Sequence, residues 1–203
     1  FIGYWDMYAS LSDNTNLSFG LVDNVRVEVP TVAPSITTQP QDQAVVQGAN
    51  ATFAVTASGM PAPGYQWRYN GAGLDGATGS AYTVTGAQSA DAGSYTVVVA
   101  NSGGSVTSTV AVLTVKVPPS TSVPLASSLV VTQGNSFTLC LSATGTAPLG
   151  YQWRFNGADL GGATDSCYTR NNVQTNDAGT YSVVVTNEVG RLTNSTVLAV
   201  VAV

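Results

Sequence analysis

Apolar and polar residues alternate along several short stretches of the chain. In residues 52–57 the apolar positions are Phe53, Val55 and Ala57, and residues 138–143 repeat this phase. A period of two places successive side chains on opposite faces of an extended backbone. Each stretch therefore predicts a β-strand with one buried face.

The same period recurs along the chain, and turn-forming segments separate the alternating stretches. Further alternating stretches are residues 65–67, 82–84 and 95–99. Segments rich in Gly, Pro, Asn and Ser are residues 59–63, 70–71 and 101–104. Many short strands spaced by such turns are typical of an antiparallel β-sandwich, so the sequence predicts an all-β fold.

The chain contains an internal repeat. GYQWRYNG at residues 64–71 returns as GYQWRFNG at residues 150–157, 86 residues later. The same offset relates DAGSY at residues 91–95 to DAGTY at residues 177–181, and the register of these motifs does not slip. Each copy has the size of a small β-sandwich rather than of a solenoid repeat. We therefore expect three parts: an N-terminal strand segment at 1–30, and sandwich domains at 31–116 and 117–203.

Five motifs in fixed order resemble a known family. They are a glycine before the second strand, a G-x-P-x-P turn, a tryptophan in the third strand, an N-G turn and a D-A-G-x-Y segment. Together they resemble the I-set of the immunoglobulin superfamily, in the tandem form found in bacterial surface and secreted proteins. The resemblance implies two tandem Ig-like antiparallel β-sandwiches. It also implies that Trp67 and Trp153 are core tryptophans and that Tyr95 and Tyr181 are corner tyrosines, whose hydroxyls bond back to the backbone.

The chain departs from the family where the inter-sheet cysteines would stand. Val55 and Val97 occupy these positions in the first copy, and Leu141 and Val183 occupy them in the second. Burying an aliphatic pair contributes a few kcal/mol, comparable to the ~2–4 kcal/mol of a disulfide. We expect these apolar contacts to hold the two sheets together.

The two cysteines of the chain lie elsewhere. Cys140 and Cys167 each neighbour an inward-facing residue, so both are expected to face solvent. The family resemblance makes their strands antiparallel neighbours, which predicts a cross-strand disulfide between them. The first copy has Ala54 and Ala81 at the equivalent places, as a paired function would require. The alternative is two unrelated free thiols.

Residues 1–30 match neither copy. An aromatic run at residues 1–8 and an alternating stretch at residues 17–29 predict two strands, which resemble the last strands of a concanavalin-like jelly roll. A lone hairpin is marginally stable in water. This segment is therefore a remnant of a larger sandwich, an extension docked on the first copy, or a set of strands donated to another subunit. The candidate self-association residues are Phe1, Tyr4, Trp5, Tyr8, Phe19 and Leu21.

Composition removes several classes of function. Charged residues are 8% of the chain, the net charge is −5 and histidine is absent, which excludes histidine-based catalysis and His-ligated zinc. Five scattered arginines and one lysine offer no basic stripe for nucleic acid. No apolar run is long enough to span a bilayer. The carboxylates form no recurring pair, so we expect no enzyme activity, no metal and no cofactor.

One basic residue has an unusual position. Arg170 takes the inward phase that Val84 holds in the first copy. A buried arginine without a partner is costly, so we expect the strand to end there and the side chain to reach solvent.

The expected function is a non-catalytic extracellular module. Proline-containing linkers at residues 30–34 and 117–121 favour a semi-rigid rod that spaces or attaches parts of a larger surface or secreted assembly. The expected partners are proteins or further copies of the chain. One alternative is an extracellular filament subunit that polymerises through its N-terminal strands. The other is a carbohydrate-binding accessory module of a secreted hydrolase.

Overall fold

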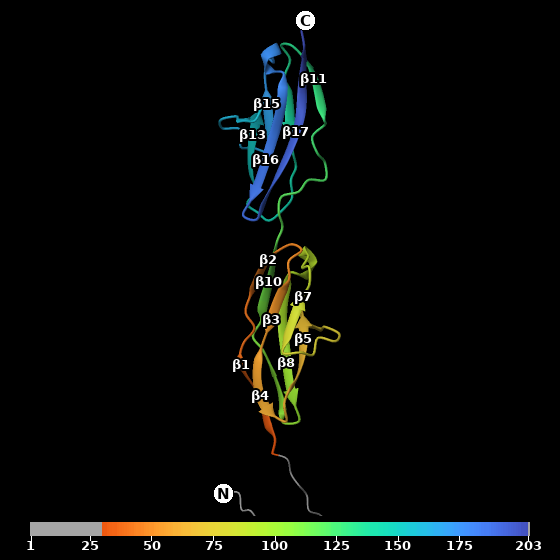
Figure 1. Ribbon diagram of the computed structural model, residues 1–203, viewed down its shortest axis with the longest axis vertical. Helices are drawn as coiled ribbons and strands as arrows, with labels where there is room; N and C mark the ends of the chain where they lie inside the picture. The colour runs from red at the N-terminus through yellow and green to blue at the C-terminus, as the bar shows by residue number, and fades with distance from the viewer. Residues whose placement is uncertain (1–29, 203) are drawn as a thin grey trace, which may run out of the picture. The chain divides into compact units, whose positions relative to one another are not determined.

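A computed structural model of the chain describes residues 30–202, which form two β-sandwich domains (Figure 1). The strands of the first domain are β1 (Val32–Thr38), β2 (Gln43–Val46), β3 (Ala51–Ala54), β4 (Thr56–Met60), β5 (Gly64–Tyr69), β6 (Ala72–Gly73), β7 (Ala81–Val84), β8 (Gly93–Asn101), β9 (Gly104–Thr107) and β10 (Ala111–Lys116). Those of the second domain are β11 (Ser128–Thr132), β12 (Phe137–Cys140), β13 (Gly150–Phe155), β14 (Ala158–Asp159), β15 (Cys167–Arg170), β16 (Gly179–Asn187) and β17 (Gly190–Val201). One 3-10 turn precedes the longest hairpin of each domain, at η1 (Ser89–Asp91) and η2 (Thr175–Asp177).

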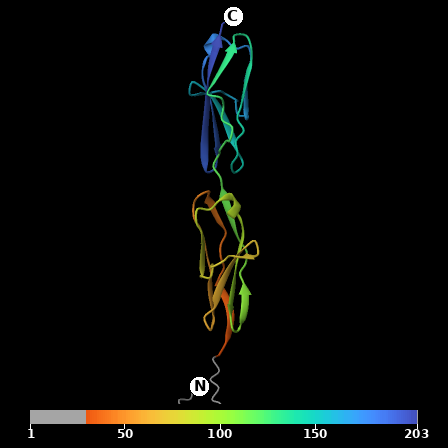
Figure 2. The ribbon, with the colours of Figure 1, turned by 90° about the vertical axis from the view of Figure 1, so that its right-hand side faces the viewer.

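Each domain has two layers of strands (Figures 1 and 2). In the first domain one layer has the order β2-β10-β8-β5-β6, with β9 also paired to β8, and the other contains the pairs β1-β4 and β3-β7. In the second domain the corresponding layers are β11-β17-β16-β13-β14 and the pair β12-β15. The all-β expectation with two Ig-like sandwiches is confirmed.

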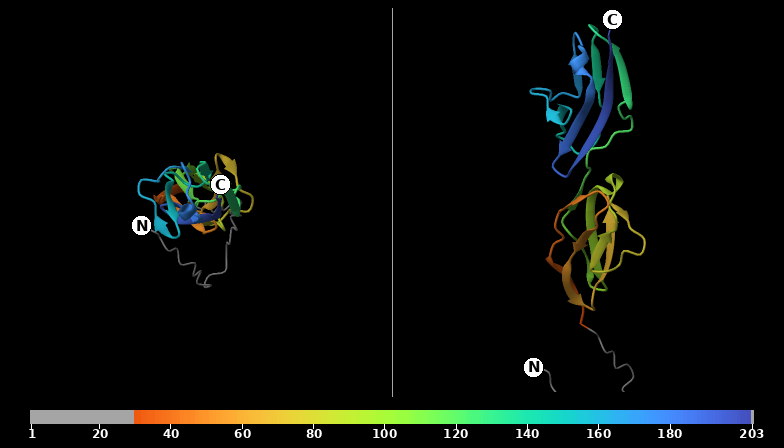
Figure 3. Two further views of the ribbon diagram at one scale, coloured as in Figure 1. Left: turned by 90° about the horizontal axis from the view of Figure 1, so that it is seen from above. Right: turned by 45° about the horizontal axis from the view of Figure 1, so that its top comes forward.

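One strand pair in each domain is parallel, which the expectation of purely antiparallel sandwiches did not include. β2 runs parallel to β10, and β11 runs parallel to β17. Figure 3 shows the two domains from two further directions. In each case a strand near the start of the domain lies beside the last one. Because these two strands are far apart in sequence, no hairpin constrains their relative direction.

The repeat offset changes in the last strands. Ala111 pairs with Tyr95, and Thr196 pairs with Tyr181, so these equivalent residues are 85 rather than 86 positions apart. The first domain has a break between β9 and β10, where the backbone N–H of Val97 donates to Ser108 Oγ at 3.0 Å. The second domain has one continuous strand, β17. The first domain therefore has a one-residue bulge between β9 and β10, while the repeated motifs keep their offset of 86 residues.

Candidate functional site

The core tryptophans lie between the layers of each domain. Trp67 on β5 and Trp153 on β13 are fully buried. Each indole N–H donates to a backbone carbonyl, that of Gly79 at 3.0 Å and that of Asp165 at 2.9 Å. The burial of each indole therefore leaves no donor unpaired.

The positions that carry cysteine in the family are buried and aliphatic here. Val55 and Val97 belong to the core of the first domain, and Leu141 and Val183 belong to that of the second. Their exposed fractions are between 0% and 5%. Apolar contact thus occupies the place of the inter-sheet bond in both domains.

The corner tyrosines tie the start of β8 and β16 to the preceding 3-10 turn. The hydroxyl of Tyr95 donates to the carbonyl of Asp91 at 2.9 Å, and that of Tyr181 donates to the carbonyl of Asp177 at 3.1 Å. Burial, followed by the negative charge of the nearby aspartate, raises the pKa of each tyrosine to about 12. Each hydroxyl therefore holds the start of its strand against the preceding 3-10 turn.

Arg170 is the last residue of β15, and its side chain is 46% exposed. Its guanidinium donates to Asp177 Oδ1 at 2.7 Å, while the backbone N–H of Gln174 donates to the other carboxylate oxygen at 2.8 Å. Burial alone would raise the pKa of Asp177, but these two hydrogen bonds outweigh it and lower that pKa. The sequence analysis did not predict this ion pair. The repeat did contain a signal for it, since Val84 of the first domain is replaced by the charged Arg170 in the second.

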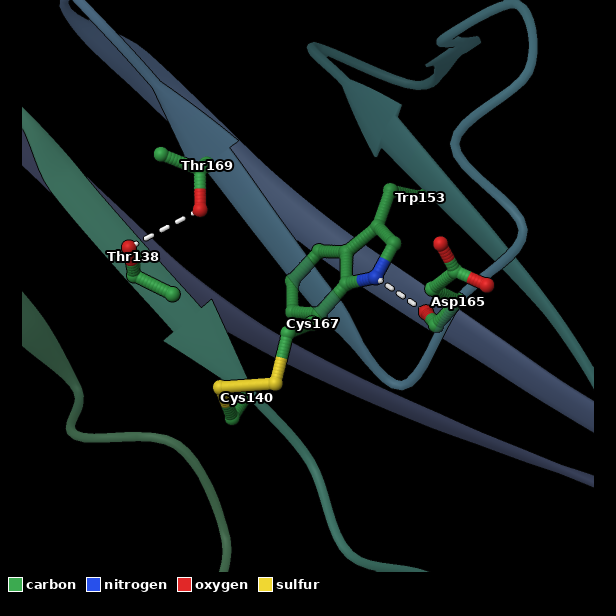
Figure 4. Close-up of a disulfide and its surroundings, with 6 residues drawn as sticks. All are labelled: Thr138, Cys140, Trp153, Asp165, Cys167 and Thr169. Atoms are coloured by element: carbon green, nitrogen blue, oxygen red, sulfur yellow. Dashed lines mark hydrogen bonds between the residues drawn. A yellow bond between two sulfur atoms is a disulfide. The ribbon is translucent and has the colours of Figure 1, made fainter.

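Cys140 and Cys167 are joined by a disulfide on the exposed face of the β12-β15 sheet (Figure 4). Two residues along the same strands, Thr138 and Thr169 share a hydrogen bond at 2.9 Å. The equivalent face of the first domain has a threonine pair in the same place and an Ala54–Ala81 pair opposite each other. The disulfide is therefore a covalent cross-strand link that the second domain has in addition to the shared pattern.

The candidate self-association residues lie outside the described part of the chain. Phe1, Tyr4, Trp5, Tyr8, Phe19 and Leu21 precede residue 30, where the description begins. Between residues 30 and 202 no group of three or more His, Cys, Asp or Glu side chains could hold a metal ion. No helix in that range has the length and apolar character needed to cross a membrane.

Two family models match the chain, one over each sandwich. The model of the immunoglobulin domain matches residues 33–101, and that of the immunoglobulin I-set domain matches residues 119–200. The chain carries two immunoglobulin domains in tandem. The motifs that repeat in the sequence fall within these two matches.

Two curated proteins resemble parts of the immunoglobulin tandem. Endoglucanase C of Cellulomonas fimi is 50% identical over 60 residues, which are 28% of this chain and 5% of the endoglucanase. The Decoration protein of Escherichia phage T5 is 38% identical over 85 residues, which are 41% of this chain and 52% of that protein. The chain therefore spans at most about half the length of these relatives.

Solved structures of tandem immunoglobulin domains share the fold. The I67–I69 fragment of titin has a TM-score of 0.65 at 21% identity, covering 84% of this chain and 66% of the fragment. Domains 1–4 of Sidekick-1 have a TM-score of 0.66 at 22% identity, covering 88% and 51%. The insect immune protein hemolin has a TM-score of 0.66 at 23% identity, covering 83% and 47%. At these identities the likeness establishes the fold alone.

Proposed function

We propose that the chain is a non-catalytic extracellular module that spaces and attaches parts of a larger surface or secreted assembly. The observation that carries this proposal is the short connection between the two immunoglobulin domains. β10 ends at Lys116, and Ser120 already pairs with Thr144 of the second domain, so only residues 117–119 lie between. Three residues span at most about 10 Å, and Val117 is itself hydrogen-bonded to Thr146 of the second domain, which limits the range of relative domain motion.

Two further observations support an extracellular structural role. Disulfides on an exposed sheet face persist in oxidising compartments, and Cys140 and Cys167 form such a bond. The phage relative is named as a decoration protein, which is consistent with a module carried on the surface of a larger particle. The domain boundaries expected from the sequence, 31–116 and 117–203, would give two such modules.

The experiment compares the chain with a variant in which six alternating Gly and Ser residues are inserted between Lys116 and Val117, so that residues 117–119 keep their contacts with the second domain. Nitrogen-15 relaxation measured by NMR gives a rotational correlation time for each domain. We expect similar, long correlation times for both domains in the natural chain and shorter ones in the variant. Equally short times in both proteins would contradict the spacer function.

Labelling the untreated native protein with a thiol reagent tests whether the protein comes from an oxidising compartment. Reactive thiols would argue against an oxidising exterior.

A carbohydrate-binding accessory role is the second candidate, and the 60-residue similarity to an endoglucanase favours it. Binding of the chain to soluble and insoluble glucans, measured by calorimetry and by pull-down, tests this role. The filament alternative depends on the N-terminal strand segment at residues 1–30. Light scattering that shows the same monomer mass at all concentrations would rule it out.

A further inference from the structure

The segment that connects the two domains is bound to the second domain by a group of short hydrogen bonds. The backbone N–H of Val117 donates to Thr146 Oγ1 at 2.7 Å, and the backbone N–H of Thr146 donates to the carbonyl of Val117 at 2.9 Å. Asn187 Nδ2 donates to the carbonyls of Val117 at 2.7 Å and Thr146 at 3.0 Å. We call this arrangement the asparagine clasp. It fixes the start of the connection on the turn between β16 and β17.

Close packing extends the clasp along the connection. Pro119 is buried, and a Cβ added to Gly190 would lie 2.8 Å from Cβ of Pro118. Asn187 Oδ1 also accepts hydrogen bonds from the backbone N–H groups of Val189 and Gly190. One side chain therefore shapes the β16–β17 turn and holds the incoming chain at the same time.

An ion pair stands next to the clasp. Lys116, the last residue of β10, donates to Glu188 Oε2 at 2.8 Å, and Glu188 follows Asn187 in the same turn. Lys116 is the one lysine of the whole sequence. The pair joins the final strand of the first domain to the turn of the second, which the clasp by itself does not do.

The first domain has the clasp without the ion pair. Asn101 Nδ2 donates to the carbonyls of Val32 and Pro61, each at 2.8 Å. Ser102 stands where the second domain has Glu188, and Pro30 stands 86 residues before Lys116. Because an immunoglobulin domain of this chain forms its clasp without these charges, the ion pair is not needed for the clasp. The effect of the Lys116–Glu188 ion pair is therefore expected at the joint between the two domains.

We propose that Lys116 and Glu188 form an electrostatic latch that biases the orientation of the first domain relative to the second. The two side chains are 31% and 48% exposed, so dissolved salt screens their attraction. The clasp is built from uncharged groups and remains in place when the latch is open. The joint therefore has a salt-sensitive part and a salt-insensitive part. This inference refines the proposed spacer function but rests on the contacts at the joint.

The test measures inter-domain distances in the full chain by single-molecule energy transfer. Dyes are attached through non-natural residues at the exposed positions Ser105 and Ser136, so the native disulfide stays intact. At low salt we expect Glu188→Gln to lower the ratio of latched to open molecules by up to about fivefold. Raising the salt to about 1 M, where screening acts over roughly 3 Å, is expected to bring the natural chain to the same ratio.

Two further variants decide between outcomes. The exchange Lys116→Glu with Glu188→Lys reverses the pair and is expected to restore the natural distribution. Asp159→Asn removes an exposed ion pair with Arg154 that lies within the second domain and is expected to change nothing. A Glu188→Gln distribution identical to the natural one at low salt would overturn the latch, as would failure of the exchange to restore it. Independent tumbling of the domains in the relaxation experiment would instead count against the spacer function, so the two failures are distinguishable.

Discussion

At the scale of single residues, Thr196 is a polar group in an apolar setting. Its side chain is 2% exposed, and its hydroxyl has no hydrogen-bond partner among the described residues. The first domain has Ala111 at the equivalent place, opposite its corner tyrosine. An unpaired buried hydroxyl costs about 1–3 kcal/mol. We expect Thr196→Val, which keeps the shape, to raise the unfolding free energy of the second domain by about 1 kcal/mol in urea denaturation. The exposed Thr193→Val is the control, and an equal gain there would contradict the explanation.

The Arg170–Asp177 pair is a second residue-scale feature, and its contribution depends on pH. Folding lowers the pKa of Asp177 below its usual value of 3.8. The associated stability is therefore present above that value and is lost as the pH falls through the folded-state pKa. We expect Arg170→Gln to destabilise the second domain by about 1 kcal/mol at neutral pH and by progressively less below pH 3.8.

Chemical denaturation at several pH values measures this difference. Arg154→Gln is the matched control, because Arg154 and Asp159 form a more exposed pair, at 40% and 59%. We expect no measurable effect from the control. A destabilisation by Arg170→Gln that stays constant down to the lowest pH would show that the ion pair with Asp177 is not its cause.

At the scale of strands, the sequence was most informative where a local pattern decides the structure. Alternation and the repeated Trp and Tyr motifs specify β5, β8, β13 and β16, because one buried face requires one phase. The bulge at Ser108 was not predictable from local sequence. It depends on the backbone N–H of Val97 on β8, which lies opposite Ser108 only in the folded domain. The asparagine clasp was also missed. Asn101 and Asn187 sit in ordinary turn sequences, and only the fold brings the entering chain beside them.

The covalent link between β12 and β15 gives an element-scale prediction. The disulfide closes a loop with a sequence separation of 27, for which the chain-entropy estimate is about 3–4 kcal/mol. Replacing Cys140 and Cys167 by alanine reproduces the Ala54–Ala81 pair of the first domain. We expect thermal denaturation to show a less stable second domain and an unchanged first domain. An unchanged second transition would mean that the strand pair is already held fully by the core and the threonine pair.

At the scale of the whole molecule, the two domains have the same type of fold but differ in their covalent cross-links. Both rely on buried aliphatic side chains where the family has an inter-sheet disulfide, so neither has a covalent bond across its core. Among the described residues, only the second domain has a disulfide, and this bond joins the neighbouring strands β12 and β15 of one sheet. Tension applied to the ends of the chain would therefore act on two different kinds of module.

Pulling single molecules by their termini tests that difference. When the second domain unfolds with its disulfide intact, the loop between Cys140 and Cys167 stays closed and cannot extend. An extended chain gains about 3.3–3.6 Å per residue, so a separation of 27 residues withholds about 90–100 Å. We expect a reducing agent to lengthen one unfolding step by that amount and to leave the step of the first domain unchanged. The alanine variant should show the long step without reducing agent. Equal steps under all conditions would contradict a closed loop, because a closed loop resists extension however strong or weak the surrounding fold is.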